Sequence, residues 1–178
     1  MQMSTLARPV VVLVVLSLLG FLTHLIPHDM GITTVGAIGM LSAAYLPRHL
    51  VGFPVLISVL FVDAVHGFYA VLAMGLVCFA HIGAAYVGRP IFRRVTPITV
   101  VGAAIASALV FYLISNLAPM AMGFYPATPT GWITCYLNAI PFLMRGILAN
   151  LLFGGAVFGV IWLVRGNGAH RIPAAQCH

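Results

Sequence analysis

The sequence predicts an all-α polytopic membrane protein, folded as a compact bundle of six transmembrane helices. Of its 178 residues, 62% are hydrophobic and 6% are charged, whereas a soluble domain has charges at about 25% of its positions. The apolar residues fall into six runs, separated by short segments that contain proline, glycine or arginine. These observations exclude a soluble or secreted globular protein. We assign residues 1–166 to one transmembrane domain and residues 167–178 to a polar C-terminal tail.

Six spans account for the apolar runs, and several are at or below the roughly 20 residues needed to cross the hydrocarbon core. The first span is expected to be retained, because no small-residue cleavage site of a signal peptide follows it. In chain order, we place the spans at Pro9 to Leu25, Thr33 to Leu46, Val51 to Val65, Ala70 to Val87, Ile98 to Leu117 and Leu143 to Val164.

Pro141 divides the last apolar region. Because proline lacks a backbone N–H donor, it kinks or ends a helix. We therefore expect Gly131 to Ile140 to be a lead-in segment that lies on the membrane surface. The last span would then begin at Leu143, with Arg145 in its first turn.

Three of the spans carry small residues four positions apart, a spacing that lets helix backbones approach one another closely. Such faces either pack within the bundle or dock another membrane protein. The pairs are Gly39 with Ala43, Gly102 with Ala106, and Gly155 with Gly159.

The arginines predict the orientation of the bundle. Six spans place both termini on the same side of the membrane, and seven of the eight arginines then fall on that side. Because basic residues are retained in cytoplasmic loops, both termini are predicted to be cytoplasmic. The segments Pro27 to Ile32 and Ala118 to Thr130 would be external loops, and Arg145 is the exception to the bias.

Polar side chains gather in the half of the bundle that this orientation places outside. An arginine near the bilayer centre costs roughly 2.5–3.5 kcal/mol on insertion scales, so Arg145 either binds something or extends to the interface. The asymmetry predicts a pocket open to the outside. Its candidate substrate-binding residues are His28, Asp63, His66, Tyr69, Asn116, Trp132, Tyr136, Asn138 and Arg145.

Asp63 and Arg145 are expected to face one another across this pocket, directly or through a ligand. A carboxylate inside a membrane span indicates a functional site by default, although a purely structural ion pair with Arg145 is the alternative. Asp63 shares a helix face with His66, three residues further on. The aromatic side chains near the outer ends of the spans would either stack on a flat ligand or form an interfacial belt.

Two other kinds of function remain open. A permease or binder for a metal ion or metal chelate could use His28, Asp63, His66, Cys78 and His81, although no fixed metal-ligand spacing is present. An intramembrane enzyme could use Asp63 and His66 as acid and base, but no nucleophile lies beside a base in the sequence. We therefore expect a binding protein and not an enzyme.

Several motifs resemble a bacterial membrane-protein family of uncharacterised function. The string YPATPTGWITCYLNAIPFLMRGILANLLFGG (Tyr125 to Gly155) resembles its C-terminal signature. The stretch Gly31 to Leu41 looks like its N-terminal motif, and Phe111 to Leu117 resembles its Phe-rich Asn motif. Asp63 and Gly67 look like its Asp-x-x-x-Gly turn. The family would have an acid near Asn150, where this chain has an amide.

That family looks like the substrate-binding S components of energy-coupling factor vitamin transporters. The resemblance implies a six-helix bundle in the bacterial cytoplasmic membrane that captures a vitamin-like small molecule at its outer face. Arg145 would engage an anionic or carbonyl group of the ligand and Asp63 would orient it. The small-residue faces would dock a transmembrane coupling protein driven by cytoplasmic ATPases, so the chain would need no cofactor. S-component-like proteins for corrinoids also exist, and their use of cysteine and histidine at cobalt makes Cys78 and His81 candidate cobalt ligands.

Overall fold

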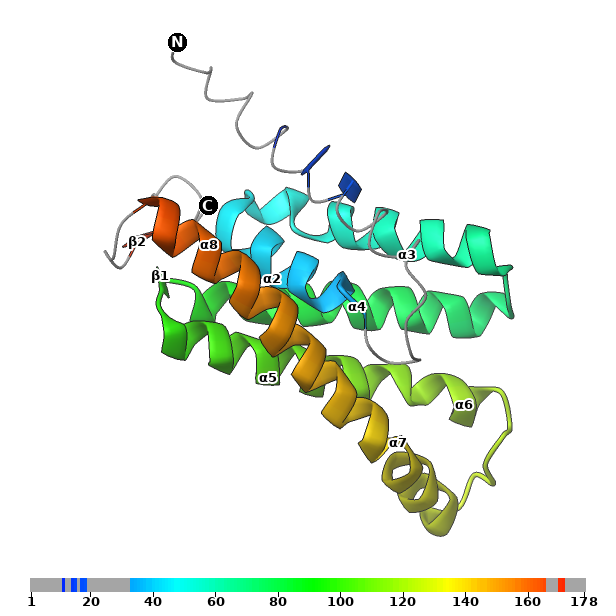
Figure 1. Cartoon of the computed structure of the whole chain (residues 1–178). Helices are drawn as coiled ribbons and strands as arrows, with labels where there is room; N and C mark the ends of the chain where they lie inside the picture. The colour runs from blue at the N-terminus through cyan, green and yellow to red at the C-terminus, as the bar shows by residue number, and fades with distance from the viewer. Residues whose placement is uncertain (1–10, 12–13, 16, 19–32, 166–169, 172–178) are drawn as a thin grey trace.

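The computed structural model describes residues 11, 14–15, 17–18, 33–165 and 170–171 (Figure 1). This part of the chain is mostly helical, as predicted, and two short strands pair antiparallel where α4 turns into α5. The predicted first span lies largely outside the described residues. The elements are α2 (Val35–Tyr45), η1 (Arg48–Leu50), α3 (Gly52–His66), α4 (Val71–Ile91), β1 (Arg94–Val95), α5 (Pro97–Ser115), α6 (Leu117–Ala121), α7 (Pro129–Ala149), η2 (Asn150–Gly154), α8 (Gly155–Arg165) and β2 (His170–Arg171).

Four helical segments in the described part are long and apolar enough to cross a membrane. They agree with a multi-pass membrane protein, and three of them match the predicted third, fourth and fifth spans. The expected turn at Gly67 is present, with glycine in the left-handed region at φ 100°. The four segments are Arg48–His66, Val71–Ile91, Pro97–Ala121 and Pro129–Leu163.

α2 is the short helix at the centre of the bundle. Nine of its 11 residues are buried, so it has almost no face left for lipid or water. It packs against α3, α4, α5 and η2. At about 1.5 Å per residue, a helix of this length covers only about half of the hydrocarbon core. α2 is therefore a buried core helix and does not cross the membrane alone.

α2 and α4 approach closely through small residues. A Cβ added at Gly39 would lie 3.1 Å from the Cβ of Ala85, and one added at Gly88 would lie 3.3 Å from the Cβ of Ala43. The predicted small-residue face of α2 thus packs inside the protein. By contrast, the space around Gly155 and Gly159 on α8 is open among the described residues.

Hydrogen bonds from α4 hold the chain that leaves α2. Arg89 Nη1 donates to the carbonyl oxygen of Leu46 at 2.7 Å, and the Tyr86 hydroxyl donates to that of Arg48 at 2.8 Å. The predicted fourth span ends at Val87, but α4 continues through Arg89 to Ile91. The charged side chain therefore caps the C-terminal end of α2, where free carbonyls favour a cation.

The last helical region differs from the prediction of a separate lead-in segment. Helical structure runs without a break from Pro129 to Leu163. Pro141 lies inside α7, since proline removes only one backbone donor and can bend a helix without ending it. In Figure 1 the first turns of α7 are seen nearly end-on, whereas the rest runs across the view. The Thr128 side chain begins the helix by accepting a hydrogen bond from the backbone N–H of Gly131 at 3.2 Å.

The close α2–α4 contact predicts the effect of enlarging its glycine. Gly39→Leu should destabilise the protein by about 1–3 kcal/mol or more, because the new side chain must enter a filled interior. Gly159→Leu should leave the stability of the monomer nearly unchanged, since nothing lies within 4 Å of its added Cβ. Thermal unfolding in detergent measures both. Equal unfolding temperatures for the two variants would contradict this packing.

Candidate functional site

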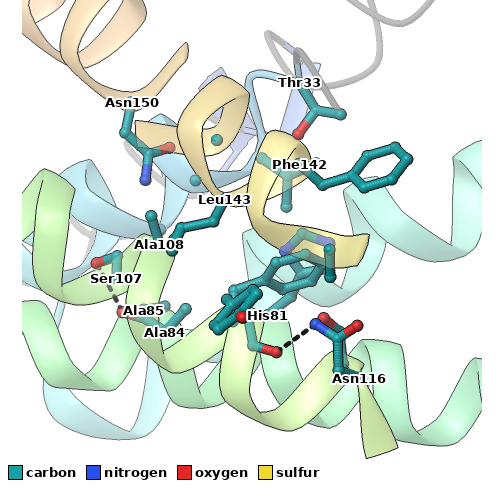
Figure 2. Close-up of a pocket in the computed structure, with 18 residues that line it drawn as sticks. Thr33, His81, Ala84, Ala85, Ser107, Ala108, Asn116, Phe142, Leu143 and Asn150 are labelled. Atoms are coloured by element: carbon teal, nitrogen blue, oxygen red, sulfur yellow. Dashed lines mark hydrogen bonds between the residues drawn. The ribbon is translucent and has the colours of Figure 1, made fainter. Parts of the chain in front are cut away.

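A cavity of about 340 Å³ lies among α2, α4, α5 and α7, at the N-terminal end of α2 (Figure 2). Its volume is at the lower end of the roughly 300–1,000 Å³ of small-molecule sites. Apolar side chains make up most of its wall, as in such sites generally. The polar side chains that line it are Thr33, His81, Ser107, Tyr112, Ser115, Asn116 and Asn150.

The polar groups at the cavity are held by backbone carbonyls. Ser107 Oγ donates to the carbonyl oxygen of Ala84 at 2.9 Å, and Asn116 Nδ2 donates to that of Tyr112 at 2.7 Å; both bonds are drawn in Figure 2. Burying a polar group is costly unless it is hydrogen-bonded. Because these bonds use donors, the hydroxyl and amide oxygens keep acceptor capacity for an occupant of the cavity.

Asn150 enters the cavity from the π-helical turn η2. Only 6% of the residue is exposed, and its Nδ2 donates to the carbonyl oxygen of Ala104 at 3.2 Å. A π-helical turn contains one extra residue, and such turns often occur at functional sites. In Figure 2 the Asn150 amide lies at one side of the cavity, and Asn116 lies at another.

Rings form a further part of the wall. The His81 ring on α4 lies 4.2 Å from the Phe111 ring on α5, between ring centres, with their planes tilted by 34°. Phe142 and Leu143 contribute from α7. The rings give the cavity an aromatic part, so it combines a place for a ring with hydrogen-bonding groups.

The charge around the cavity favours a neutral occupant. None of the described residues that line it is an aspartate, glutamate, lysine or arginine. The N-terminus of α2 faces the cavity and would favour a negative charge by about 0.3–1 kcal/mol. Taking a carboxylate out of water costs several kcal/mol. Since that cost exceeds the gain at the helix terminus, a charged ligand is disfavoured without a counter-charge.

The structure places one of the nine predicted substrate-binding residues, Asn116, at this cavity. His28 lies outside the described residues. His81, which we considered as a metal ligand, lines the cavity, whereas Cys78 packs against the hydrophobic core. Among the described residues, no group of three or more histidine, cysteine or acidic side chains could hold a metal ion.

Asp63 lies away from the cavity, near the end of α3. Its side chain is buried, with 8% of the residue exposed, and its Oδ2 has no hydrogen-bond partner in the described structure. His66 Nδ1 lies 3.1 Å from the carbonyl oxygen of Val62, on the same helix. Burial raises the pKa of Tyr69, and the carboxylate of Asp63 raises it further. Asp63 thus lies near Tyr69, and both residues are outside the cavity wall.

Arg145 lies on an exposed face of α7, with its Cζ 6.0 Å from the centre of the Phe142 ring. Residues 139, 143, 146 and 150 form the stripe that faces the cavity. That spacing of four, three and four residues follows one side of a helix, and Arg145 falls outside it. No contact with Asp63 forms in the described structure. The expected shared pocket of these two charges therefore differs from the cavity that is present.

The predicted aromatic residues connect α7 to α5. The Tyr136 hydroxyl donates to the carbonyl oxygen of Leu113 at 2.8 Å, and the Tyr112 hydroxyl donates to that of Tyr136 at 2.7 Å. Trp132 stacks on Tyr136, with 6.3 Å between ring centres. Tyr136 therefore connects α7 to α5, Trp132 packs on it within α7, and neither residue lines the cavity.

Asn138 is used in the same region to hold the loop before α7. Its Nδ2 donates to the Tyr125 hydroxyl at 3.3 Å, at an exposed position. The loop that contains Tyr125 is thereby attached to the helix that follows it. Asn138 is a structural contact in this structure and lies outside the cavity wall.

Comparison with known proteins gives a family and no activity. A family model described as a family of unknown function (DUF6580) matches residues 4–174. The chain belongs to this family. No curated protein and no solved structure matches it. The expectation of an uncharacterised family is thus confirmed, and the function has to be argued from the site.

Sequence reasoning missed Ser107 and Asn150 as site residues of this DUF6580 protein. Each is a polar side chain inside an apolar span, and that signal alone indicates a functional or packing role. The spacing from Ala139 to Asn150 would also have placed Asn150 on one face with Gly146. That inference needs a helix that continues through Pro141, which the sequence does not predict.

The separation of Asp63 from Arg145 predicts that their substitutions act independently. The effects of Asp63→Asn and Arg145→Leu on the free energy of unfolding should add to within about 0.5 kcal/mol. Unfolding by SDS in mixed micelles provides the measurement. As a positive control, Trp132→Leu and Tyr136→Leu should show coupling of about 0.5–1.5 kcal/mol, because their rings stack. Coupling of that size between Asp63 and Arg145 would show that the two residues are in contact, as a shared pocket requires.

Proposed function

We propose that the protein is a membrane-embedded substrate-binding subunit that captures a small organic micronutrient from the outer side for uptake. The observation that carries the proposal is the cavity of about 340 Å³ inside a bundle of apolar helices. Its wall combines rings with a few hydrogen-bonding groups, which is the composition of small-molecule sites.

Binding suits the polar groups at the cavity better than catalysis. A serine nucleophile needs an adjacent base to activate it, but the Ser107 hydroxyl donates to the backbone carbonyl of Ala84. The hydroxyl is thereby held in place and its proton is used. Asn116 and Asn150 are amides, which do not ionise near neutral pH and so do not act as a general acid or base. These groups orient a ligand and leave it unchanged.

Energy for uptake would come from partners. The chain contains no lysine, and a P-loop requires one. We therefore assign ATP hydrolysis to cytoplasmic ATPases that act through a transmembrane coupling protein. The Gly155 and Gly159 face is open in the described structure, and this spacing supports close helix docking. This assignment follows the resemblance to S components.

The orientation of the protein completes the proposal. With the arginine-containing turn between α4 and α5 in the cytoplasm, the segment between α6 and α7 would be external, because α5 crosses the membrane between them. Asn116, which lines the cavity, lies at the α5–α6 junction, next to that segment in the chain. A ligand would then enter from the outside, past the end of α5.

Filling the cavity should abolish ligand capture. Gly146 lines the cavity, and a Cβ added there would lie 4.0 Å from that of Ala108, so Gly146→Leu extends into open space. The matched control is Gly75→Leu on α4, where nothing lies within 4 Å. Replacing glycine in a helix also gains about 0.5–1 kcal/mol of helix stability, so both variants should fold.

Native mass spectrometry of protein purified in mild detergent provides the measurement. A small molecule should accompany the unmodified protein and Gly75→Leu, and it should be absent from Gly146→Leu. If no small molecule accompanies the unmodified protein, or if Gly146→Leu retains it, capture in this cavity is wrong.

Cysteine labelling tests the orientation. In a variant without its native cysteines, Phe124→Cys should react with a membrane-impermeant maleimide added to intact cells, because Phe124 is exposed in the segment between α6 and α7. Arg93→Cys should react only after the membrane is opened. The reverse pattern would place the cavity entrance on the cytoplasmic side.

A further inference from the structure

The π-helical turn determines which way Asn150 points. η2 packs against both α2 and α5, and its first residue directs an amide between them. On α5 the Asn150 Nδ2 bonds to Ala104. On α2 its Oδ1 lies against Gly36, where a Cβ would overlap the oxygen. A polar side chain that is more than nine-tenths buried is therefore held between two helices at the edge of the cavity.

Gly36 provides the space that this oxygen occupies. It belongs to the cavity wall and has no side chain of its own. Among the described residues, no donor bonds to the Asn150 Oδ1, and Nδ2 has a second hydrogen beyond the one given to Ala104. The amide can therefore accept one hydrogen bond and donate one to an occupant of the cavity.

We propose that Asn150 is the specificity-determining residue of the cavity, and that the cavity takes an uncharged ring compound bearing a carboxamide or an equivalent donor–acceptor pair. This inference rests on the proposed function and names its substrate class. The ring lies near His81 and Phe111, and the carboxamide pairs with the Asn150 amide by two hydrogen bonds. Gly36 is a positioning residue, because it leaves room for the amide oxygen.

The neutrality of the site follows from the same contacts. Asn150 offers both a donor and an acceptor, whereas a carboxylate has only acceptors and an amidinium only donors. Either ion would meet one matched and one mismatched group. The ion would also lose its hydrating water. The described residues that line the cavity include no Asp, Glu, Lys or Arg that could serve as a counter-charge. A neutral carboxamide satisfies both groups.

Three probes of nearly equal shape test the proposal: benzamide is neutral, benzoate is an anion and benzamidine is a cation at neutral pH. Titration calorimetry or ligand-observed NMR with the full chain in detergent gives each dissociation constant. Benzamide should bind at least tenfold more tightly than either ion. Preference for benzoate would show that the N-terminus of α2 dominates, and it would overturn the proposal. Absence of benzamide binding at millimolar concentration would overturn it as well.

Variants then assign the preference to Asn150. Asn150→Leu should weaken benzamide binding at least tenfold, since both hydrogen bonds are lost. Asn150→Asp should reverse the order so that benzamidine binds best, because the site then has acceptors only. Gly36→Ala should weaken benzamide binding as Asn150→Leu does, whereas Gly83→Ala, outside the cavity wall, should not. The relative affinities of the three probes for the unmodified protein test the proposal even if a variant fails to fold.

The outcomes separate this inference from the proposed function. Benzamide binding that is lost in Gly146→Leu but unchanged in Asn150→Leu would reject the role of Asn150 and leave capture in the cavity intact. A small molecule that accompanies the purified protein and carries a full charge would reject the substrate class alone. If no small molecule accompanies the unmodified protein, the proposed function fails whichever probe binds.

Discussion

The close packing of α2 on α4 is the contact on which the arrangement of the bundle depends. Gly39 and Ala43 on one helix meet Ala85 and Gly88 on the other, and the missing side chains allow the backbones to approach. Dispersion between closely packed helices replaces the hydrophobic effect, which drives little association inside lipid. Because this contact is central, α2 is buried on nearly all sides, and the longer helices pack around it.

The short length of α2 explains why a cavity exists. Helices α4, α5 and α7 continue past the point where α2 begins, so the space beyond its first turn is not filled by α2 itself. The cavity includes Val35 and Gly36 from that turn. Closing it would require larger side chains at positions such as Gly36, Ala108 and Gly146. The small residues at these positions thus leave a space inside the protein, although protein interiors are normally close-packed.

The sequence predicts the helices of this protein better than it predicts which residues face inward. Hydropathy and proline positions locate α3, α4 and α5 to within a few residues, since the bilayer requires long apolar helices. They fail at Pro141, because a proline can lie inside a helix at the loss of one hydrogen bond, and α7 continues through it. The cavity wall requires an α7 that continues through Pro141, which the sequence does not predict. If α7 were not continuous, Arg145 would lie at the entrance of a pocket open to the outside. Asn150 would then not align with Ala139 and Gly146.

The charged residues that the sequence singles out lie outside the cavity. We selected Arg145 and Asp63 because ionised groups have the highest free-energy cost inside a membrane. We took that cost to indicate a binding pocket. The structure instead lines its cavity with amides, hydroxyls and a histidine. Neutral polar groups can be fully buried once a backbone carbonyl accepts from them, as Ser107 and Asn150 show. A charge needs a counter-charge or water as well.

The position of η2 relates the cavity to the open face of α8. Asn150 begins the π-helical turn, and Gly155, the first residue of the open face, follows the turn directly. A π-helical turn holds one residue more than an α-helical turn, so its loss would rotate everything that follows by about 100°, the angle between successive helical residues. A hydrogen bond from a ligand to Asn150 would act on the turn that sets the direction of the open face. Ligand capture and partner docking would therefore share one structural element, and substitutions at Asn150 should alter both, whereas substitutions at Gly159 should alter docking alone.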